Sequence, residues 1–355
     1  MKIKIKKSIL ENMLISSQPF LEKKDTSQIT SHLLLNASNS TLTIKATDYE
    51  IGLVSKSDKV DIFDDGSVTA NGKKLLDIVR ILKEGDIDLE LIESTLHIKQ
   101  AHSKFKLPTF SYLDFPKFPT FESKAKIMIN SYTLIDSLKK ITPTIDSANP
   151  KFELNGALID IKEDSINFVS TDTRRLGIVT TQNQTNTPLS IIVPKKAIIE
   201  IQKLFFNDID LYYDDTYLII NSNEHMFFTK LINGKFPEYN RIIPKETSKN
   251  LTLPKALIVE AIKQITTISN DVQVTFLPQN IIFKSLSEDN IEAKTEINFP
   301  TEFEEEFSIA LNSKYLIDFL NGINDSEFNI GLNENNLPFV LNENNFKTIV
   351  MPIVL

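Results

Sequence analysis

Apolar positions recur at helical spacing in three segments of the chain. These segments are SVTANGKKLLDIVRIL from Ser67, SIIVPKKAIIEIQKLF from Ser190 and SIALNSKYLIDFLNGI from Ser308. Each has a short apolar run, a polar break and then apolar residues three or four positions apart, which predicts a strand followed by an amphipathic helix. Three sets of apolar residues coincide when the segments are aligned without gaps: Leu75, Ile198 and Leu316; Ile78, Ile201 and Phe319; and Leu82, Phe205 and Ile323.

Two further elements repeat in the same order. Amphipathic stretches begin at Ile5, Ile129 and Leu253, with a constant offset of 124 residues. A strand followed by a turn begins at Thr41 and again at Ser165, and a weaker third copy starts at Asn280. An acidic residue also recurs within the first set of helices, as Asp77, Glu200 and Asp318. This order indicates duplication of a whole domain, because solenoid repeats have much shorter periods.

The repeats predict three homologous domains, at 1–122, 123–246 and 247–355. Proline-containing stretches at 109–123 and 234–246 are the expected linkers. Alternating apolar residues such as Leu89 and Leu91 predict half-buried strands between the helices. We therefore expect an α+β fold in which each domain packs two helices against antiparallel sheets. Three such domains form half of a closed ring if two chains meet head to tail as a homodimer.

Net charge, cysteine content and the length of apolar runs each bear on the class of protein. The net charge of −8 argues against a protein that clings to nucleic acid through overall positive charge, although it permits a local basic surface. The chain has no cysteine, which fits a reducing cytoplasm. We find no signal peptide at the N-terminus and no apolar run of the roughly 20 residues that cross a bilayer, so no membrane association is expected.

Lysines concentrate on the repeated amphipathic helices. If these helices line a ring, their solvent faces meet duplex DNA, and lysine contacts to phosphate are independent of base sequence. Such dispersed contacts suit a protein that slides. The predicted DNA-contacting residues are Lys24, Lys73, Lys74, Arg80, Lys139, Lys140, Lys195, Lys196, Lys203, Lys255 and Lys263.

No residue constellation indicates catalysis or a cofactor. The four histidines (His32, His97, His102 and His225) are scattered and lack the spacing of metal ligands. The repeated dipeptides Thr47-Asp48 and Thr171-Asp172 are interpreted as turns in which Asp accepts hydrogen bonds from nearby amides. We therefore expect a non-catalytic protein without cofactor or metal. Two alternatives stay open: a duplicated-domain enzyme acting on nucleotides, and a repeat scaffold protein.

Five segments resemble the bacterial β sliding clamp, the β subunit of the DNA polymerase III holoenzyme. They are ATDYEIGL (46–53), KFELNGAL (151–158), STDTRRLG (170–177), GKFPEYNRIIP (234–244) and MPIVL (351–355). Their order and spacing, over the whole chain, make the match specific. The resemblance implies a ring around duplex DNA that acts as a processivity factor. Its implied partners are the replicative polymerase, the clamp loader, and ligase and mismatch-repair proteins, all bound through short linear motifs.

The resemblance also implies a peptide-binding cleft between the second and third domains. Three of the four arginines fall in the segments concerned, and an apolar floor with a few polar groups suits a peptide. The implied cleft residues are Leu154, Thr171, Thr173, Arg174, Arg175, Leu176, Pro237, Arg241, Ile242, Asn312, Tyr315, Pro338, Ile349, Met351, Pro352 and Ile353.

Three residues of this cleft depart from the family pattern. Thr173 and Arg174 replace a more typical Gly and His, and Glu153 stands where an aromatic residue is common. We therefore expect the preferred peptide to differ from that of other members. The apolar segment 351–355 is expected either to dock at the cleft or to be a final edge strand, and both can hold together.

Overall fold

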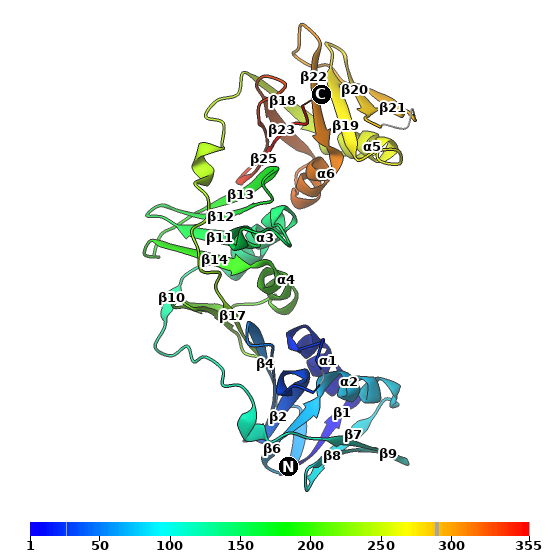
Figure 1. Ribbon diagram of the computed structural model, residues 1–355, viewed down its shortest axis with the longest axis vertical. Coiled ribbons are helices and arrows are strands. Elements are labelled where there is room, and N and C mark those ends of the chain that lie inside the picture. The colour runs from blue at the N-terminus through cyan, green and yellow to red at the C-terminus, as the bar shows by residue number, and fades with distance from the viewer. Residues whose placement is uncertain (26, 288–290, 355) are drawn as a thin grey trace. The chain divides into compact units, whose positions relative to one another are not determined.

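The computed structural model describes residues 1–25, 27–287 and 291–354. Within these residues the chain forms six α-helices, and each predicted repeat supplies two of them (Figure 1). The predicted α+β class with antiparallel sheets is confirmed. The helices are α1 (Lys7–Ser17), α2 (Gly72–Ile81), α3 (Ser131–Ile141), α4 (Lys195–Leu204), α5 (Lys255–Ile265) and α6 (Ser313–Gly322).

The chain divides into two compact units, and unit 1 comprises residues 1–132 and 199–231. Its strands are β1 (Lys2–Lys6), β2 (His32–Ser38), β3 (Thr41–Thr47), β4 (Ile51–Ser57), β5 (Val60–Asp64), β6 (Gly66–Asn71), β7 (Asp86–Ile92), β8 (Thr95–Gln100), β9 (Ser103–Pro108), β10 (Ala125–Ile127), β15 (Asp210–Tyr213), β16 (Tyr217–Asn221) and β17 (His225–Lys230). They form one sheet in the order β5-β1-β7-β8-β9 and another in the order β10-β15-β16-β17-β4-β3-β2-β6.

Unit 2 comprises residues 133–198 and the chain from residue 232 onward. Its strands are β11 (Gly156–Ile161), β12 (Ser165–Thr171), β13 (Arg175–Gln182), β14 (Leu189–Pro194), β18 (Lys249–Pro254), β19 (Asp271–Phe276), β20 (Asn280–Ser285), β21 (Lys294–Asn298), β22 (Phe307–Asn312), β23 (Glu327–Leu332), β24 (Phe339–Glu343) and β25 (Phe346–Val350). One sheet has the order β14-β11-β12-β13-β25-β24-β23-β18, and the other has the order β21-β20-β19-β22.

The repeated helices form around an apolar stripe, and α2 and α6 also have a polar N-cap. Leu75, Ile198 and Leu316, which the sequence places at one repeat position, are all buried. The side chains of Asn71 and Asn312 accept hydrogen bonds from backbone amides in the first turns of α2 and α6, which stabilises both helix starts. The third predicted repeat, a strand ending in a turn, is present as β3, β12 and β20.

Two of the sheets run from one repeat into the next. In unit 1, β4 of the first repeat pairs with β17 of the second repeat in antiparallel register. In unit 2, β13 of the second repeat pairs with β25 of the third repeat in the same way (Figure 1). Backbone hydrogen bonds therefore join neighbouring repeats into continuous sheets. We call the pairing of β4 with β17 the first junction and the pairing of β13 with β25 the second. The turn that precedes β4 lies at the first junction, and the turn that precedes β13 lies at the second.

Candidate peptide-binding site

The turn between β12 and β13 is built by the side chains of Thr171 and Asp172. Thr171 donates a hydrogen bond to the carbonyl of Arg175 and accepts one from the amide of Thr173, at 2.6 and 3.1 Å. Asp172 Oδ1 accepts from the amides of Arg174 and Arg175, at 3.1 and 3.0 Å. The same four bonds form in the turn between β3 and β4. The interpretation of both Thr-Asp pairs as turn chemistry is confirmed.

Thr173 stands at the tip of this turn in a strained backbone conformation. Its φ is 73°, in the left-handed region, where a β-branched side chain is sterically disfavoured. Its side chain is exposed, and Arg174 beside it is exposed too. Two of the three residues that depart from the family pattern, Thr173 and Arg174, therefore present their side chains to solvent at the turn.

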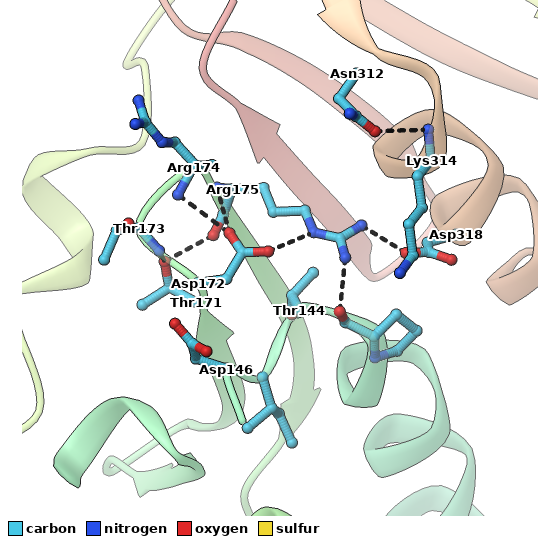
Figure 2. A network of polar contacts seen from close by, with 12 residues as sticks. Thr144, Asp146, Thr171, Asp172, Thr173, Arg174, Arg175, Asn312, Lys314 and Asp318 are labelled. Carbon is cyan, nitrogen blue, oxygen red and sulfur yellow. Dashed lines mark hydrogen bonds and ion pairs between the residues drawn. The ribbon is translucent and has the colours of Figure 1, made fainter. Parts of the chain in front are cut away.

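The side chain of Arg175 is buried and connects three parts of unit 2 (Figure 2). Its Nε donates to Asp172 Oδ2 at 3.0 Å, and its Nη1 donates to Asp318 Oδ2 on α6 at 2.8 Å. Its Nη2 donates to the carbonyl oxygen of Pro143 at 2.6 Å. The guanidinium also lies over the ring of Tyr315, with its Cζ atom 4.4 Å from the ring centroid. These three bonds go to groups of unit 2 itself, so Arg175 connects parts of the site from within.

Charged groups of the same network shift the pKa of Tyr315 in opposite directions. Burial raises the pKa of its hydroxyl above the ordinary value, and the carboxylate of Asp172 raises it further. The guanidiniums of Arg175 and Arg174 lower that pKa. The net direction is upward, so Tyr315 stays protonated at neutral pH and can donate a hydrogen bond.

Apolar residues form a buried cluster beside the turn. Three of the predicted residues, Leu154, Leu176 and Ile349, belong to this cluster. They come from a short 3-10 helix (Phe152–Leu154), from β13 and from β25, so the two repeats share one apolar core at their junction. The other buried members are Leu158, Val169, Ile178, Ile192, Phe236 and Tyr239, with Ile232, Ile243 and Val340 packed against them.

The segment after β25 is docked by its backbone. The amide of Met351 donates to the carbonyl of Arg174 at 2.9 Å, and the amide of Ile353 donates to the carbonyl of Ala310 at 2.7 Å. β25 ends at Val350 and lies between β13 and β24 in its sheet, so the prediction of a final edge strand is wrong for the described residues 351–354. The side chain of Met351 is 39% exposed, whereas Pro352 and Ile353 are half-buried. Leu355 lies outside the described residues.

The remaining predicted residues have varied roles. Asn312 caps α6 through Oδ1, and its Nδ2 donates to Asp271 at 3.0 Å, so its side chain is occupied within the fold. Pro237 and Arg241 are exposed, Ile242 is 41% exposed, and Pro338 is half-buried.

Several residues that build this site were missed by the sequence prediction. Phe236 and Tyr239 were assigned to a linker, yet both are buried in the apolar cluster. The hydroxyl of Tyr239 donates to Asp160 Oδ2 at 2.6 Å, which anchors that linker to β11. Asp318 was noticed only as a recurring acid. Its recurrence at a repeat position was the available signal, but nothing in the sequence indicated Arg175 as its partner.

The structure separates the predicted DNA-contacting residues into two groups. The side chains of Lys24, Lys73, Lys74, Arg80, Lys139, Lys196, Lys203 and Lys263 are exposed. The other three are buried or half-buried and bond within the protein. Lys140 is buried and pairs with Asp136 at 3.0 Å, Lys195 donates to the carbonyl of Ile145, and Lys255 donates to the carbonyl of Ile323. Burial also lowers the pKa of Lys195. The predicted set stays a prediction, and its exposed members are the ones most accessible to phosphate.

Residues 1–25, 27–287 and 291–354 contain no group of three His, Asp or Glu side chains arranged to hold a metal ion. Within the same ranges, none of the helices has the length and apolar character needed to cross a membrane.

Family models match the chain in three consecutive stretches. The N-terminal domain of the DNA polymerase III beta subunit matches residues 1–119. The central domain of that subunit matches residues 128–238, and its C-terminal domain matches residues 240–354. Together the three models account for almost all of the chain.

Individual proteins agree with the family models. The Beta sliding clamp of Helicobacter pylori strain J99 is 38% identical over 337 residues, covering 92% of this chain and 90% of that protein. The crystal structure of the Helicobacter pylori beta clamp bound to a DNA ligase peptide is similar, with a TM-score of 0.95 and 38% identity over the full length of both chains. The Pseudomonas aeruginosa DNA polymerase III beta subunit, 23% identical, shares the fold with a TM-score of 0.92 over all of both chains.

Proposed function

This chain belongs to the family of DNA polymerase III beta subunits, the beta sliding clamps, and we propose that it binds its protein partners at the site around Arg175. It is a processivity factor that encircles duplex DNA and tethers the replicative polymerase and other DNA-processing proteins to it. The observation that carries the proposal for the site is the junction of β13 and β25. There, Arg174 and Met351 are exposed at the ends of two strands that contribute residues to the buried apolar cluster.

The proposed ligand is a short linear peptide with apolar anchor residues. Apolar anchors gain affinity by entering a desolvated site, and Met and Ile side chains adapt to several anchor shapes. Met351 and Ile242 are partly exposed and are close in sequence to residues of the cluster, so they suit this role. Because the related Helicobacter pylori clamp was solved with a DNA ligase peptide, we propose that ligase is among the partners here. We further propose that the polymerase, the clamp loader and mismatch-repair proteins use the same site.

We propose that the exposed basic residues of the helices contact the DNA backbone without reading its sequence. Two chains, each with domains at 1–122, 123–246 and 247–355, would close the ring as a homodimer. The protein would itself be non-catalytic and would act in the cytoplasm. The net charge of −8 supports weak and local contacts, which a sliding ring requires, over tight binding.

A titration with the DNA ligase peptide tests the site. Fluorescence anisotropy of a labelled peptide would give the affinity of the wild-type chain and of the double variant Met351→Ala, Ile242→Ala. We expect the double variant to bind about tenfold more weakly, because two partly exposed apolar contacts are truncated. Leu113→Ala is the matched control, since Leu113 is 77% exposed and lies outside the site. Equal affinity of the double variant and the wild type would contradict the proposal.

A further inference from the structure

The buried ion pairs of Arg175 carry a desolvation cost that a gain in folding stability does not explain. Its side chain is 3% exposed and is held by two carboxylates and one backbone carbonyl. Burying charged groups carries a desolvation penalty, so apolar residues of similar volume often give equal or greater stability than a buried ion pair. A buried network of this kind therefore calls for a reason other than folding energy.

The first junction of the chain contains the same turn without the arginine. The offset of 124 residues that aligns Asp48 with Asp172 also aligns Ile51 with Arg175. Ile51 is buried, and it pairs with Thr229 in the register in which Arg175 pairs with Val350. An apolar side chain at this position is therefore sufficient to build the turn and to continue the sheet into the next repeat.

The acidic residues at the repeat position of Asp318 make different contacts in the other two repeats. Glu200 stands at the repeat position of Asp318, and its carboxylate bonds Lys203 on its own helix at 2.9 Å. Asp77, the third member of the set, is exposed. Among these three acids, the contact from helix to turn through an arginine occurs at the junction that carries the candidate site.

From these observations we infer that Arg175 is a positioning residue for peptide binding, an inference that rests on the proposed function. Arg175 bonds Asp172 and Asp318 at once (Figure 2). It thereby fixes the turn that carries Thr173 and Arg174 relative to α6, the helix of Tyr315. The two sides of the site then meet the peptide in one geometry. Such preorganisation raises affinity because the protein loses less freedom when the peptide binds.

The test replaces the network by neutral groups of similar size. The triple variant Asp172→Asn, Arg175→Met, Asp318→Asn removes all three charges and keeps an Oδ1 acceptor for the turn amides. We expect its midpoint of unfolding to equal or exceed that of the wild type. Its affinity for the DNA ligase peptide should be about tenfold lower. The matched control at the first junction is Asp48→Asn, Ile51→Met, Glu200→Gln, which should leave peptide affinity unchanged.

The possible outcomes test two separate claims, the positioning role of Arg175 and the proposed function of the site. If the triple variant binds the peptide as tightly as the wild type, or loses affinity only in proportion to lost stability, the positioning role is wrong. If the triple variant does not fold, Asp318→Asn replaces it, and Asp318→Glu should recover part of the affinity because it restores the charge. No rescue by Asp318→Glu would overturn the inference. If Met351→Ala, Ile242→Ala has no effect either, the proposed function of the site fails as well.

Discussion

The backbone amide of Met351 donates a hydrogen bond to the carbonyl of Arg174 across 2.9 Å. The amide of Lys230 bonds the carbonyl of Glu50 across 2.8 Å at the equivalent position of the first junction. The same backbone hydrogen bond therefore forms at the ends of both β17 and β25. At the first junction the chain continues beyond Lys230, whereas at the second the segment 351–354 lies beside the candidate peptide site.

Deleting residues 351–355 should weaken peptide binding more than it weakens the fold. The deletion removes two backbone hydrogen bonds, which contribute about 1 kcal/mol each, and leaves β25 intact. It also removes the partly exposed Met351. We expect peptide affinity to fall by about tenfold and the free energy of unfolding to change by about 2 kcal/mol or less. Calorimetric titration and chemical denaturation measure the two quantities, and an unchanged affinity would refute the role of the segment.

Replacing Thr173 by Gly should stabilise the protein. The φ of 73° costs a β-branched residue about 1–2 kcal/mol, whereas glycine adopts it freely. Glycine costs about 0.5–1 kcal/mol in chain entropy, so a net gain of about 0.5–1 kcal/mol is expected. Urea denaturation measures the change. The control Thr181→Gly, in the extended strand β13, should destabilise the protein, and a loss of stability in both variants would contradict the strain argument.

Reversing exposed lysines on the helices should impair DNA retention. The variant Lys73→Glu, Lys74→Glu, Lys139→Glu changes three exposed side chains and should lower retention on circular duplex DNA. It should also reduce the salt dependence of binding, because fewer counterions are released. The control reverses Lys117, Lys245 and Lys347, which are equally exposed but lie outside the helices. Equal losses in both variants would show a general effect of charge rather than a DNA-contacting surface.

The fold was predictable because the repeats carried a strong signal. Leu75, Ile198 and Leu316 align without gaps and are all buried, so the helical period identified the core directly. Pairing between repeats was not predictable. β4 and β17 are separated by more than 160 residues, and their register depends on side chains that meet only in the folded protein.

The candidate site was predictable in its residue types but not in its connections. The sequence indicated the Thr171-Asp172 turn and the importance of the rare arginines. It did not indicate that Arg175 would be buried against Asp318, because an ion pair between residues 143 positions apart leaves no local pattern. Replacing Arg175 by Ala should lower the free energy of unfolding, since removing the guanidinium leaves two partly buried carboxylates without their partner.

His32 should make the stability of unit 1 depend on pH. Its side chain is 6% exposed, its ring centroid lies 4.4 Å from that of Phe110, and its Nδ1 has no hydrogen-bond partner among the described residues. Burial lowers the pKa of His32 from 6.5 to about 4, and the charge of Lys74 lowers it further. Between these two values the unfolded chain binds a proton that the folded protein does not. Stability is therefore lost as the pH falls from 6.5 towards 4.

The variant His32→Leu should reduce this dependence. At pH 7 the two proteins should differ only by the packing change, because the imidazole is neutral in both states of the wild type. At pH 4 the wild type should have lost up to about 3 kcal/mol more than the variant, at 1.36 kcal/mol per pH unit. Urea denaturation at half-unit steps of pH measures both curves, and their difference isolates His32 from the carboxylates and from His225. Parallel curves would mean that His32 is protonated equally in the folded and unfolded states.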